Sequence, residues 1–439
     1  MPELQPQLVI MPEQTPQSET PPQSETPSQS EQPPQSEQPP QSEQQRSIET
    51  MMNRLGRCAA EQGGFVNCPI YRGSTNLFKS FADTMSPNAV YCYGTFGNPT
   101  RANLEKAWTA LTGGAGTLVL SSGAQAVAYA LMAVLNAGDN VLMTDTAYLP
   151  TRKFCDNFLS RKGISTVYYD PCITPDELRE LLHKHPNTTA LFMESPGSQT
   201  FEVQDVPGLC AVAHELNVTT LIDNTWATPM FFDAHAKGCD ISIEAGTKYL
   251  SGHSDLIIGL ISANAAWIPT MRDTLGLFQS TPSDESCFLA LRGLRTMYMR
   301  VREAERRGLE VARFMKSRPE VLKVLHPAIP DCAGHNIWKR DFTGSTAVFS
   351  IVLQPRYTLQ DVEHMLDNYK LFAMGYSWGG FESLVMYYDC TTYRTATAFA
   401  PGGLLVRYQI GLEGLEDLKE DLVEGFDRLN VEKSACVRE

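Results

Sequence analysis

One lysine in the sequence stands where it could do covalent chemistry. Lys248 lies in the stretch EAGTKYLSGHSD, residues 244–255, directly after a short apolar run. A lysine at the end of a buried strand is costly unless it is paired or chemically used. Desolvation lowers the pKa of such an amine, which can then form a Schiff base with an aldehyde cofactor and later move protons. Taken alone, Lys248 could equally be a surface or helix-capping residue.

A carboxylate ends a second aliphatic run. Asp223 lies in LIDNTWATP, residues 221–229. Such an aspartate can be structural, because it can cap a loop or pair with a neighbouring side chain. It can also keep the ring nitrogen of a pyridine cofactor protonated, so that the ring withdraws electrons. Lys248 and Asp223 end neighbouring predicted strands, so they are plausible partners across one such ring.

Two further elements would suit the same kind of cofactor. The stretch SSGAQAV, residues 121–127, indicates a strand, a glycine turn and a helix start, and backbone N–H groups at a helix N-terminus bind phosphate. Turns of this kind are common, so this signal is weak alone. After the next predicted strand, Tyr148 in TDTAYLP could lay its ring against a planar cofactor or could simply pack in the core.

Short aliphatic and β-branched runs must supply the strands that position these side chains. Seven strands are predicted, at 117–122, 140–145, 165–170, 189–195, 219–224, 240–246 and 256–262. Amphipathic segments separate them, and one begins with Thr174-Pro175-Asp176-Glu177, a capping-box spacing with proline at the first helical position. This alternation predicts an α/β fold with a mostly parallel sheet, whose ligands bind outside the strand ends.

The pattern changes after about residue 275. Longer helices are predicted near 299–317, 359–369 and 413–430, with a strand in STAVFSIVL, residues 345–353. These elements predict a smaller α+β C-terminal domain. The expected organisation is a tail (1–48), an N-terminal arm (49–98), a large α/β domain (99–290) and the C-terminal domain (291–439). The tail consists of near-repeats of Pro, Gln, Ser and Glu, a composition that is typical of disorder.

Composition narrows the class of function. The net charge of −14 argues against a nucleic-acid surface, and the 11 Cys, without a CxxC pair, favour reduced cytoplasmic thiols over a disulfide framework. The eight His form no ligand cluster, so no metal is expected. Residues 115–138 are uncharged and as long as a membrane span, but Ser121-Ser122-Gly123 interrupts them, and no signal peptide is visible. Small-molecule chemistry without a membrane is expected.

The order of phosphate turn, tyrosine, aspartate and lysine resembles the Cys/Met-metabolism group of fold-type I pyridoxal-phosphate (PLP) enzymes, and within it the cystathionine β-lyases. The similarity runs from about Val66 to Phe426. It includes VNCPIYRGST (66–75), GNPTRANLE (97–105), ESPGS (194–198), RGLRTM (292–297), WKRDFTGS (338–345), YSWGGFES (376–383) and VRYQIGLE (406–413). The resemblance implies a three-layer domain of the aspartate aminotransferase type and PLP as the cofactor.

The resemblance also implies roles for single residues. Lys248 would carry the cofactor as a Schiff base and then shuttle the α-proton, Asp223 would pair with the pyridine nitrogen, and Tyr148 would stack on the ring. Lys248, Tyr148 and Tyr93 are the implied catalytic residues. The phosphate would be held by the backbone N–H groups of Gly123 and Ala124 and the hydroxyls of Thr247 and Tyr93. Arg407 would clamp the substrate α-carboxylate as a bidentate fork, helped by Ser377 and Trp378.

Two motifs favour one reaction within this group. Trp378 in SWGGFES and the sequence ESPGS are similar to β-lyases, whereas γ-acting members usually resemble SLGG and ESPTN. We therefore expect a carbon–sulfur β-lyase that cleaves cystathionine or another cysteine S-conjugate to a thiol, pyruvate and ammonia. The alternatives are a γ-replacement or γ-elimination enzyme, including one of specialised metabolism, and a non-catalytic relative.

One stretch departs from the resemblance. In this group the segment before GNPT typically reads Tyr-x-Arg-x-Gly and reaches the cofactor phosphate of the neighbouring subunit in a homotetramer with shared active sites. In YCYGTFGNPT, residues 91–100, Tyr93 takes the tyrosine position and Thr95 the arginine position. A register with Tyr91 as the tyrosine also leaves no arginine there. We expect weak PLP retention unless Arg101 or another cation supplies the missing charge.

Overall fold

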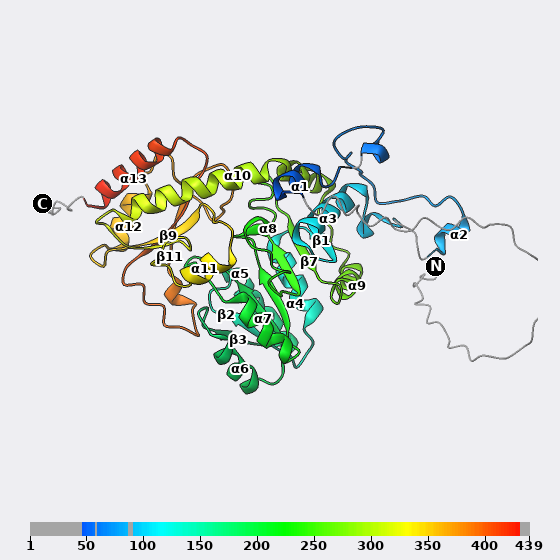
Figure 1. Cartoon of the computed structure of the whole chain (residues 1–439), viewed down its shortest axis with the longest axis horizontal. Helices are drawn as coiled ribbons and strands as arrows, with labels where there is room; N and C mark the ends of the chain where they lie inside the picture. The colour runs from blue at the N-terminus through cyan, green and yellow to red at the C-terminus, as the bar shows by residue number, and fades with distance from the viewer. Residues whose placement is uncertain (1–45, 58, 87–90, 431–439) are drawn as a thin grey trace, which may run out of the picture. The chain divides into compact units, whose positions relative to one another are not determined.

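The computed structural model describes residues 46–57, 59–86 and 91–430. The predicted tail therefore lies outside the described residues, except for its last three. Ser47 caps the first helix, α1 (Ile48–Arg54), because its hydroxyl accepts the N–H of Thr50. Figure 1 labels the helices and strands that follow and colours them in chain order.

Among the described residues, seven strands form a large sheet in the order β1-β7-β6-β5-β4-β2-β3. They are β1 (Gly116–Leu120), β2 (Asn140–Thr144), β3 (Ser165–Tyr169), β4 (Thr188–Glu194), β5 (Thr219–Asp223), β6 (Ile241–Glu244) and β7 (Gly259–Ala263). Pairing is parallel except where β7 runs antiparallel to β1 and β6. All seven predicted strands and the mostly parallel sheet are confirmed.

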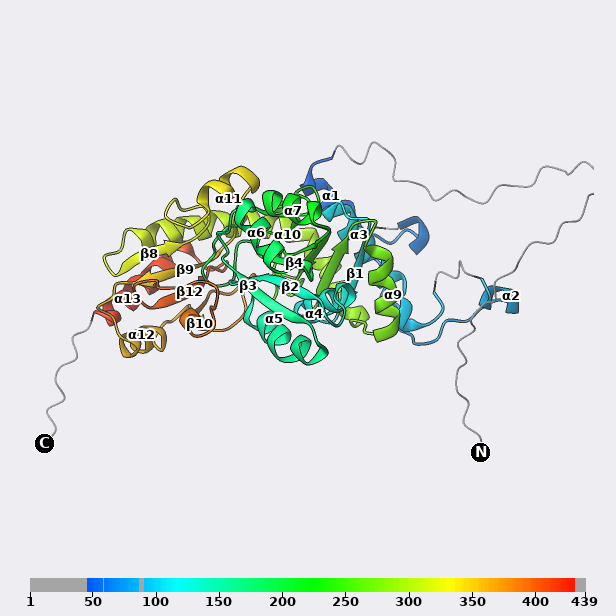
Figure 2. The same ribbon diagram turned by 90° about the horizontal axis from the view of Figure 1, so that it is seen from below.

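Helices cover both faces of this sheet, which gives three layers. Along β1, Val119 belongs to the buried cluster on one face of the sheet, whereas Leu118 and Leu120 belong to the cluster on the opposite face. Figure 2 shows α6 and α7 above the strands and α4 and α5 below them. The helices of these layers are α3 (Pro99–Thr112), α4 (Gly123–Val134), α5 (Leu149–Phe154), α6 (Pro175–Lys184), α7 (Val206–Glu215) and α9 (Ile268–Phe278). The capping box predicted at Thr174 is present at the start of α6.

Shorter elements connect these helices and strands. They are η1 (Ala59–Gln62), α2 (Phe81–Thr84), η2 (Gly94–Phe96), the π-helical turn η3 (Cys155–Leu159), η4 (Ser160–Lys162), α8 (Thr228–Phe231), α11 (His335–Asp341) and η5 (Cys390–Thr392).

The helix α10 (Asp284–Lys316) is 33 residues long, so the prediction that it begins near 299 is wrong. Ser283 caps its N-terminus, since the Ser283 hydroxyl accepts the N–H of Ser286 at 3.1 Å. Gly293 weakens the helix signal in this stretch. The fold requires it, because a Cβ there would lie 2.3 Å from the carbonyl oxygen of Leu250. The predicted domain boundary after residue 290 falls inside this helix.

Within the same ranges, a second sheet of five strands has the order β10-β11-β12-β9-β8. Its strands are β8 (Val321–Leu325), β9 (Val348–Leu353), β10 (Ala373–Met374), β11 (Leu384–Tyr388) and β12 (Leu405–Gln409). One face, with Phe349 and Tyr408, packs against the C-terminal half of α10 and against α12 (Leu359–Leu366) and α13 (Leu415–Leu429). Both of these helices were predicted to within three residues at each end. The other face carries Arg407.

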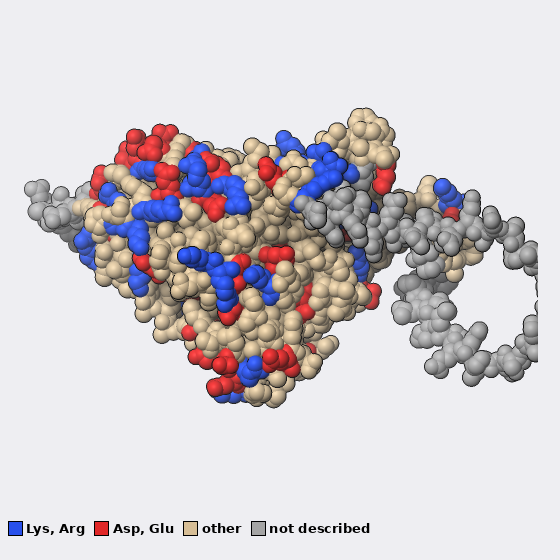
Figure 3. All heavy atoms as spheres, viewed as in Figure 1, with Lys and Arg blue, Asp and Glu red and all other residues tan. Residues whose placement is uncertain are grey.

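The described surface mixes charges of both signs. Figure 3 shows acidic and basic side chains interspersed over α10 and α13. On α10, Glu303 pairs with Arg306 and Arg307 at 2.7 Å in each case. None of the described helices is long and apolar enough to cross a membrane. In the described ranges, no group of three or more His, Cys, Asp or Glu is placed to hold a metal ion.

Candidate active site

Lys248 lies in the turn that follows β6, and hydrogen bonds from α10 hold this turn in place. The Lys248 N–H donates to the carbonyl of Ala245 at 3.0 Å, and its own carbonyl accepts the N–H of Gly252 at 2.8 Å. From α10, the Arg300 guanidinium donates to the carbonyl oxygens of Tyr249 and Leu250 at 2.8 and 3.1 Å. The backbone that carries the lysine is therefore held on both sides.

The Lys248 amine is half-buried beside residues of the loop that precedes β11. Its Nζ donates to the Ser377 hydroxyl at 3.0 Å and lies 5.2 Å from the centre of the Trp378 ring. Burial and the neighbouring Arg407 charge lower the pKa of Lys248 to about 8, although Asp223 and Glu382 oppose this shift. Near neutral pH, an amine with this pKa can both accept and release a proton.

Asp223 ends β5, which pairs with β6, so its carboxylate lies beside the Lys248 turn as the sequence predicts. One oxygen, Oδ1, accepts the N–H and the hydroxyl of Thr225 at 3.0 and 2.5 Å. The other oxygen, Oδ2, makes no hydrogen bond to a described residue. Burial raises the pKa of Asp223, while the Thr225 hydrogen bonds and the Lys248 charge oppose that rise. A ligand donor could use the open oxygen.

Tyr148 precedes α5, and a second buried carboxyl fixes its backbone. The Tyr148 N–H donates to Glu194 Oε2 at 2.7 Å. Glu194 ends β4 and pairs directly with Asp223 in the register of β4 and β5. Burial and the nearby Asp223 charge raise the pKa of Glu194 to about 8. The sequence motifs assigned Glu194 no role, although ESPGS places this glutamate at the end of a predicted strand.

The predicted phosphate turn has the expected form. Ser122 caps α4, since its hydroxyl accepts the N–H of Gln125 at 3.1 Å, and the N–H groups of Gly123 and Ala124 lie at the open end of the helix. Only glycine fits at 123, where a Cβ would lie 2.5 Å from the Ala245 Cβ. The Thr247 hydroxyl donates to the carbonyl of Ile258 at 3.1 Å, so its phosphate role stays a prediction.

Arg407 is buried on β12 without an acidic partner among the described residues. Its hydrogen bonds to described residues all use Nη2, which donates to three successive carbonyl oxygens, at 3.4, 2.9 and 3.2 Å, of Gly375, Tyr376 and Ser377. Nε and Nη1 remain for a ligand. A buried guanidinium without a counterion is costly, so this arrangement indicates that a bound anion completes it.

Tyr93 and Thr95 lie elsewhere in the same chain. They line a cavity of about 260 Å³, and no hydrogen bond or ring contact among the described residues joins Tyr93 to Lys248, Asp223 or Tyr148. Arg101 does not supply a free cation. Two of its nitrogens donate to the Thr95 carbonyl at 3.2 Å, and the third lies 3.5 Å from Glu105.

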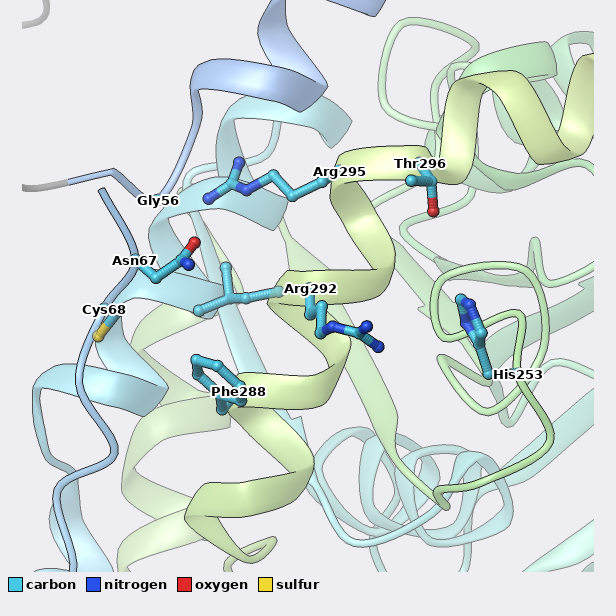
Figure 4. A pocket seen from close by; sticks show the side chains of 9 residues that line it. Gly56, Asn67, Cys68, His253, Phe288, Arg292, Arg295 and Thr296 are labelled. Atoms are coloured by element: carbon cyan, nitrogen blue, oxygen red, sulfur yellow. The ribbon is translucent and has the colours of Figure 1, made fainter. Parts of the chain in front are cut away.

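A further cavity of about 330 Å³ contains none of the predicted residues (Figure 4). It lies between the N-terminal segment and α10. Arg295 reaches across it to donate to the carbonyl oxygens of Met52 and Leu55, at 3.0 and 2.5 Å. Arg292 projects from the same helix on the side of His253 (Figure 4). This cavity is therefore separate from the Lys248 cluster.

Comparison with known proteins agrees with this geometry. Residues 49–427 match the family model described as Cys/Met metabolism PLP-dependent enzyme. The chain belongs to this family. The resemblance stated from the sequence motifs is thereby confirmed, and so is PLP dependence as the family property.

Relatives of this PLP-dependent family cover nearly the whole folded chain. A Saccharomyces cerevisiae protein provisionally named a cystathionine beta-lyase is 51% identical and covers 76% of this chain and 97% of its own length. The Escherichia coli cystathionine beta-lyase MetC is 39% identical over 88% of this chain and 99% of its own. Among solved structures, a cystathionine gamma synthase from Xanthomonas oryzae pv. oryzae has a TM-score of 0.80 and 28% identity, covering 88% and 98%. The predicted fold class is confirmed.

The residues of this chain fit the cofactor of the family. The Lys248 amine of lowered pKa suits an aldehyde, the open Asp223 oxygen suits a pyridine nitrogen, and the N-terminus of α4 suits a phosphate. The structure brings together Lys248, Ser377, Trp378 and Arg407 from two sheets. Its described contacts do not bring in Tyr93.

Proposed function

We propose that this protein is a carbon–sulfur β-lyase that cleaves cystathionine or a related cysteine S-conjugate to a thiol, pyruvate and ammonia. The observation that carries the proposal is the half-buried Lys248 amine next to Ser377, with the Asp223 carboxylate and the unpaired Arg407 guanidinium close enough to shift its pKa. Relatives named cystathionine beta-lyase support the choice of reaction.

The residues that would hold PLP come from the large sheet. Lys248 would bind the aldehyde carbon, Asp223 the ring nitrogen, and the Tyr148 side chain the ring face. Gly123, Ala124 and Thr247 would bind the phosphate, with Tyr93 contributed by a neighbouring subunit. When bound, PLP supplies an electron sink for negative charge at the substrate α-carbon.

Lys248 moves the proton in this proposal. Because its pKa is about 8, part of the Lys248 amine is neutral near neutral pH and can take the α-proton. The ammonium formed can then return a proton. Ser377 accepts a hydrogen bond from Nζ and, with the Trp378 ring 5.2 Å away, fixes the position of the amine. Loss of the thiolate from Cβ then gives, after hydrolysis, pyruvate and ammonia.

Arg407 orients the substrate. A guanidinium with two nitrogens open can bind the α-carboxylate as a fork, and the three carbonyls that hold Nη2 keep it in place. Trp378 contacts Lys248 rather than Arg407, so its contribution to carboxylate binding rests on the resemblance alone. Orientation of the Cα–H bond toward Lys248 is the expected result.

A γ-acting enzyme is the second candidate, because solved γ-synthase structures share the fold at a TM-score of 0.80. Incubation of the purified holoenzyme with cystathionine separates the two reactions. Pyruvate and homocysteine would support β-elimination, whereas 2-oxobutyrate and cysteine would contradict it. Lys248→Ala is the control, and it should abolish both the products and the yellow absorbance of the lysine-bound cofactor.

The active form is proposed to be a homotetramer in which the arm, residues 49–98, reaches a neighbouring subunit. Large apolar side chains of this arm are exposed in the single chain, for example Leu77 (86%), Phe81 (82%) and Met85 (72%). Such a run is typical of an interface. Residues 99–290 would then bind PLP, and 291–439 would form the second domain. Light scattering coupled to gel filtration tests the tetramer, and Leu77→Asp should dissociate it.

The cytoplasm is the proposed location. All nine cysteines that the structure describes are free thiols, which suits a reducing compartment. Imaging of a tagged full chain tests this proposal, and secretion of the protein would contradict it.

A further inference from the structure

An aromatic ring lies against the carboxylate clamp. The Tyr388 ring centre is 4.9 Å from Cζ of Arg407, a distance at which the ring face attracts the cation. In the antiparallel pair of β11 and β12, Met386 stands opposite Arg407, so Tyr388, two residues further, lies on the same face. The guanidinium is therefore held both by this ring and by the carbonyl oxygens of residues 375–377.

A strained glutamine supports that ring. Gln199 has a φ of 65°, a left-handed conformation that side chains other than glycine rarely adopt. Its carbonyl accepts the Ser350 hydroxyl at 2.6 Å, and Ser350 stands directly opposite Arg407 on the other neighbouring strand, β9. The Gln199 side chain and the Arg407 charge both act on the Tyr388 hydroxyl, partly offsetting the rise in pKa that burial causes.

One atom of the Gln199 side chain has no partner among the described residues. Its Oε1 is buried and makes no hydrogen bond to a described residue. A strained backbone and an unpaired buried oxygen are both destabilising, and such features concentrate at functional sites. Ser350 on β9 and Tyr388 on β11 thus stand on either side of Arg407, and Gln199 is joined to Ser350 by its carbonyl.

We propose that Tyr388 and Gln199 are positioning residues that brace Arg407 for the substrate α-carboxylate. The ring face holds the guanidinium in place of an acidic partner, which would compete with the substrate. Gln199, anchored by Ser350, holds the ring. This inference rests on the proposed function only for the identity of the carboxylate ligand, because the brace acts on any α-amino acid that Arg407 binds.

The test compares two ligands on the PLP-loaded protein. L-alanine carries the α-carboxylate and ethylamine lacks it, and the dissociation constant of each is measured from the change in cofactor absorbance. Tyr388→Leu should weaken L-alanine binding about threefold to tenfold and leave ethylamine binding unchanged. Tyr388→Phe keeps the ring face but loses the hydroxyl on which Gln199 acts, so it should weaken L-alanine binding to the same extent as Gln199→Ala, and less than Tyr388→Leu does. Gln199→Ala should weaken L-alanine selectively.

The matched control is Tyr387→Leu. Tyr387 is the neighbouring residue on β11, pairs with Val406 and points to the opposite face, so neither ligand should be affected. Equal weakening of L-alanine and ethylamine in Tyr388→Leu would overturn the proposal, as would full L-alanine affinity in that variant. If Tyr388→Leu does not fold, selective weakening in Gln199→Ala supports the brace and its absence overturns it. Production of 2-oxobutyrate from cystathionine would defeat the proposed function but leave this comparison intact.

Discussion

The Lys248 amine donates a hydrogen bond to the Ser377 hydroxyl across 3.0 Å, and this bond joins the two sheets of the molecule. Lys248 follows a strand of the large sheet, and Ser377 precedes a strand of the second sheet. The two residues are separated by 129 positions in the sequence. The reacting amine is therefore positioned by long-range packing rather than by its own turn alone. Gly379 contributes to this packing, because it has a φ of 82° and lies against the Lys248 backbone.

Ser377→Ala should lower kcat/KM for the C–S substrate about threefold to tenfold. The variant removes one hydrogen bond to the amine, a loss of about 1 kcal/mol or somewhat more. Steady-state kinetics of the holoenzyme measure it. Ser317→Ala is the control, since that hydroxyl donates to Phe314 at the end of α10. Unchanged kinetics in Ser377→Ala would show that the bond does not position Lys248.

Arg407→Lys should raise KM about tenfold to a hundredfold with a smaller change in kcat. Lysine keeps the charge but cannot bind a carboxylate as a fork, and a lost charge-assisted hydrogen bond costs roughly 1.5–3 kcal/mol. Arg428→Lys, at a guanidinium that donates to the Met365 carbonyl, should leave KM unchanged. An equal fall in kcat and kcat/KM would instead place the Arg407 contacts in the transition state only.

Gly293→Ala should destabilise the protein by about 1–3 kcal/mol and lower activity. Alanine favours a helix, but its Cβ would lie 2.3 Å from the Leu250 carbonyl oxygen and push the Lys248 turn. Gly276→Ala is a matched control in α9, where the nearest atom, in Phe96, is 3.7 Å away. That variant should gain up to about 1 kcal/mol. Denaturant unfolding measures both, and similar values for the two would contradict the close approach.

The sequence alone predicts the seven strands of the large sheet and the site residues at the ends of two of them. Continuous apolar runs predict the strands because most of them lie in a sheet covered on both faces, and Asp223 and Lys248 stand at or just after the ends of two such runs. The beginning of α10 was missed, since Gly293 suits a close contact that no local pattern reveals. Helix propensity describes the chain alone, whereas this glycine depends on the Leu250 backbone.

The parts of the site that escaped prediction depend on register between strands. Glu194 meets Asp223 because β4 and β5 are neighbours with their ends aligned. Tyr388 meets Arg407 because β11 pairs with β12 in one register, and a slip of one residue would turn the ring to the opposite face. The position of Glu194 at a strand end was visible in the sequence, but the register that brings either pair together was not.

Acid should destabilise the protein through His326. This residue is fully buried, accepts the Ala328 N–H at Nδ1 and lies 3.1 Å from the Thr346 carbonyl through Nε2, so the neutral ring fits. Burial lowers its pKa from 6.5 to about 4. The unfolded chain then binds more protons between these values, and the free energy of unfolding falls by about 3 kcal/mol as pH drops from 6.5 to 4.

His326→Gln isolates this contribution. Unfolding at pH 7 and pH 4.5 should show a smaller acid-induced loss in the variant than in the wild type, because glutamine does not titrate. His364→Gln, at an exposed position on α12, should retain the wild-type loss. The same pH dependence in His326→Gln and wild type would rule out this histidine as the source.

Thr95→Arg should tighten PLP binding about tenfold. The resemblance places an arginine at this position, and the structure shows that Arg101 does not replace it, since its guanidinium is occupied by the Thr95 carbonyl and Glu105. A charge-assisted bond to phosphate is roughly 1 kcal/mol stronger than a hydroxyl bond. Equilibrium titration of the apoprotein with PLP measures the change. Ala110→Arg would test for an effect of charge alone, because Ala110 is exposed on α3. No gain in Thr95→Arg, or an equal gain in both variants, would show that another group already binds the phosphate.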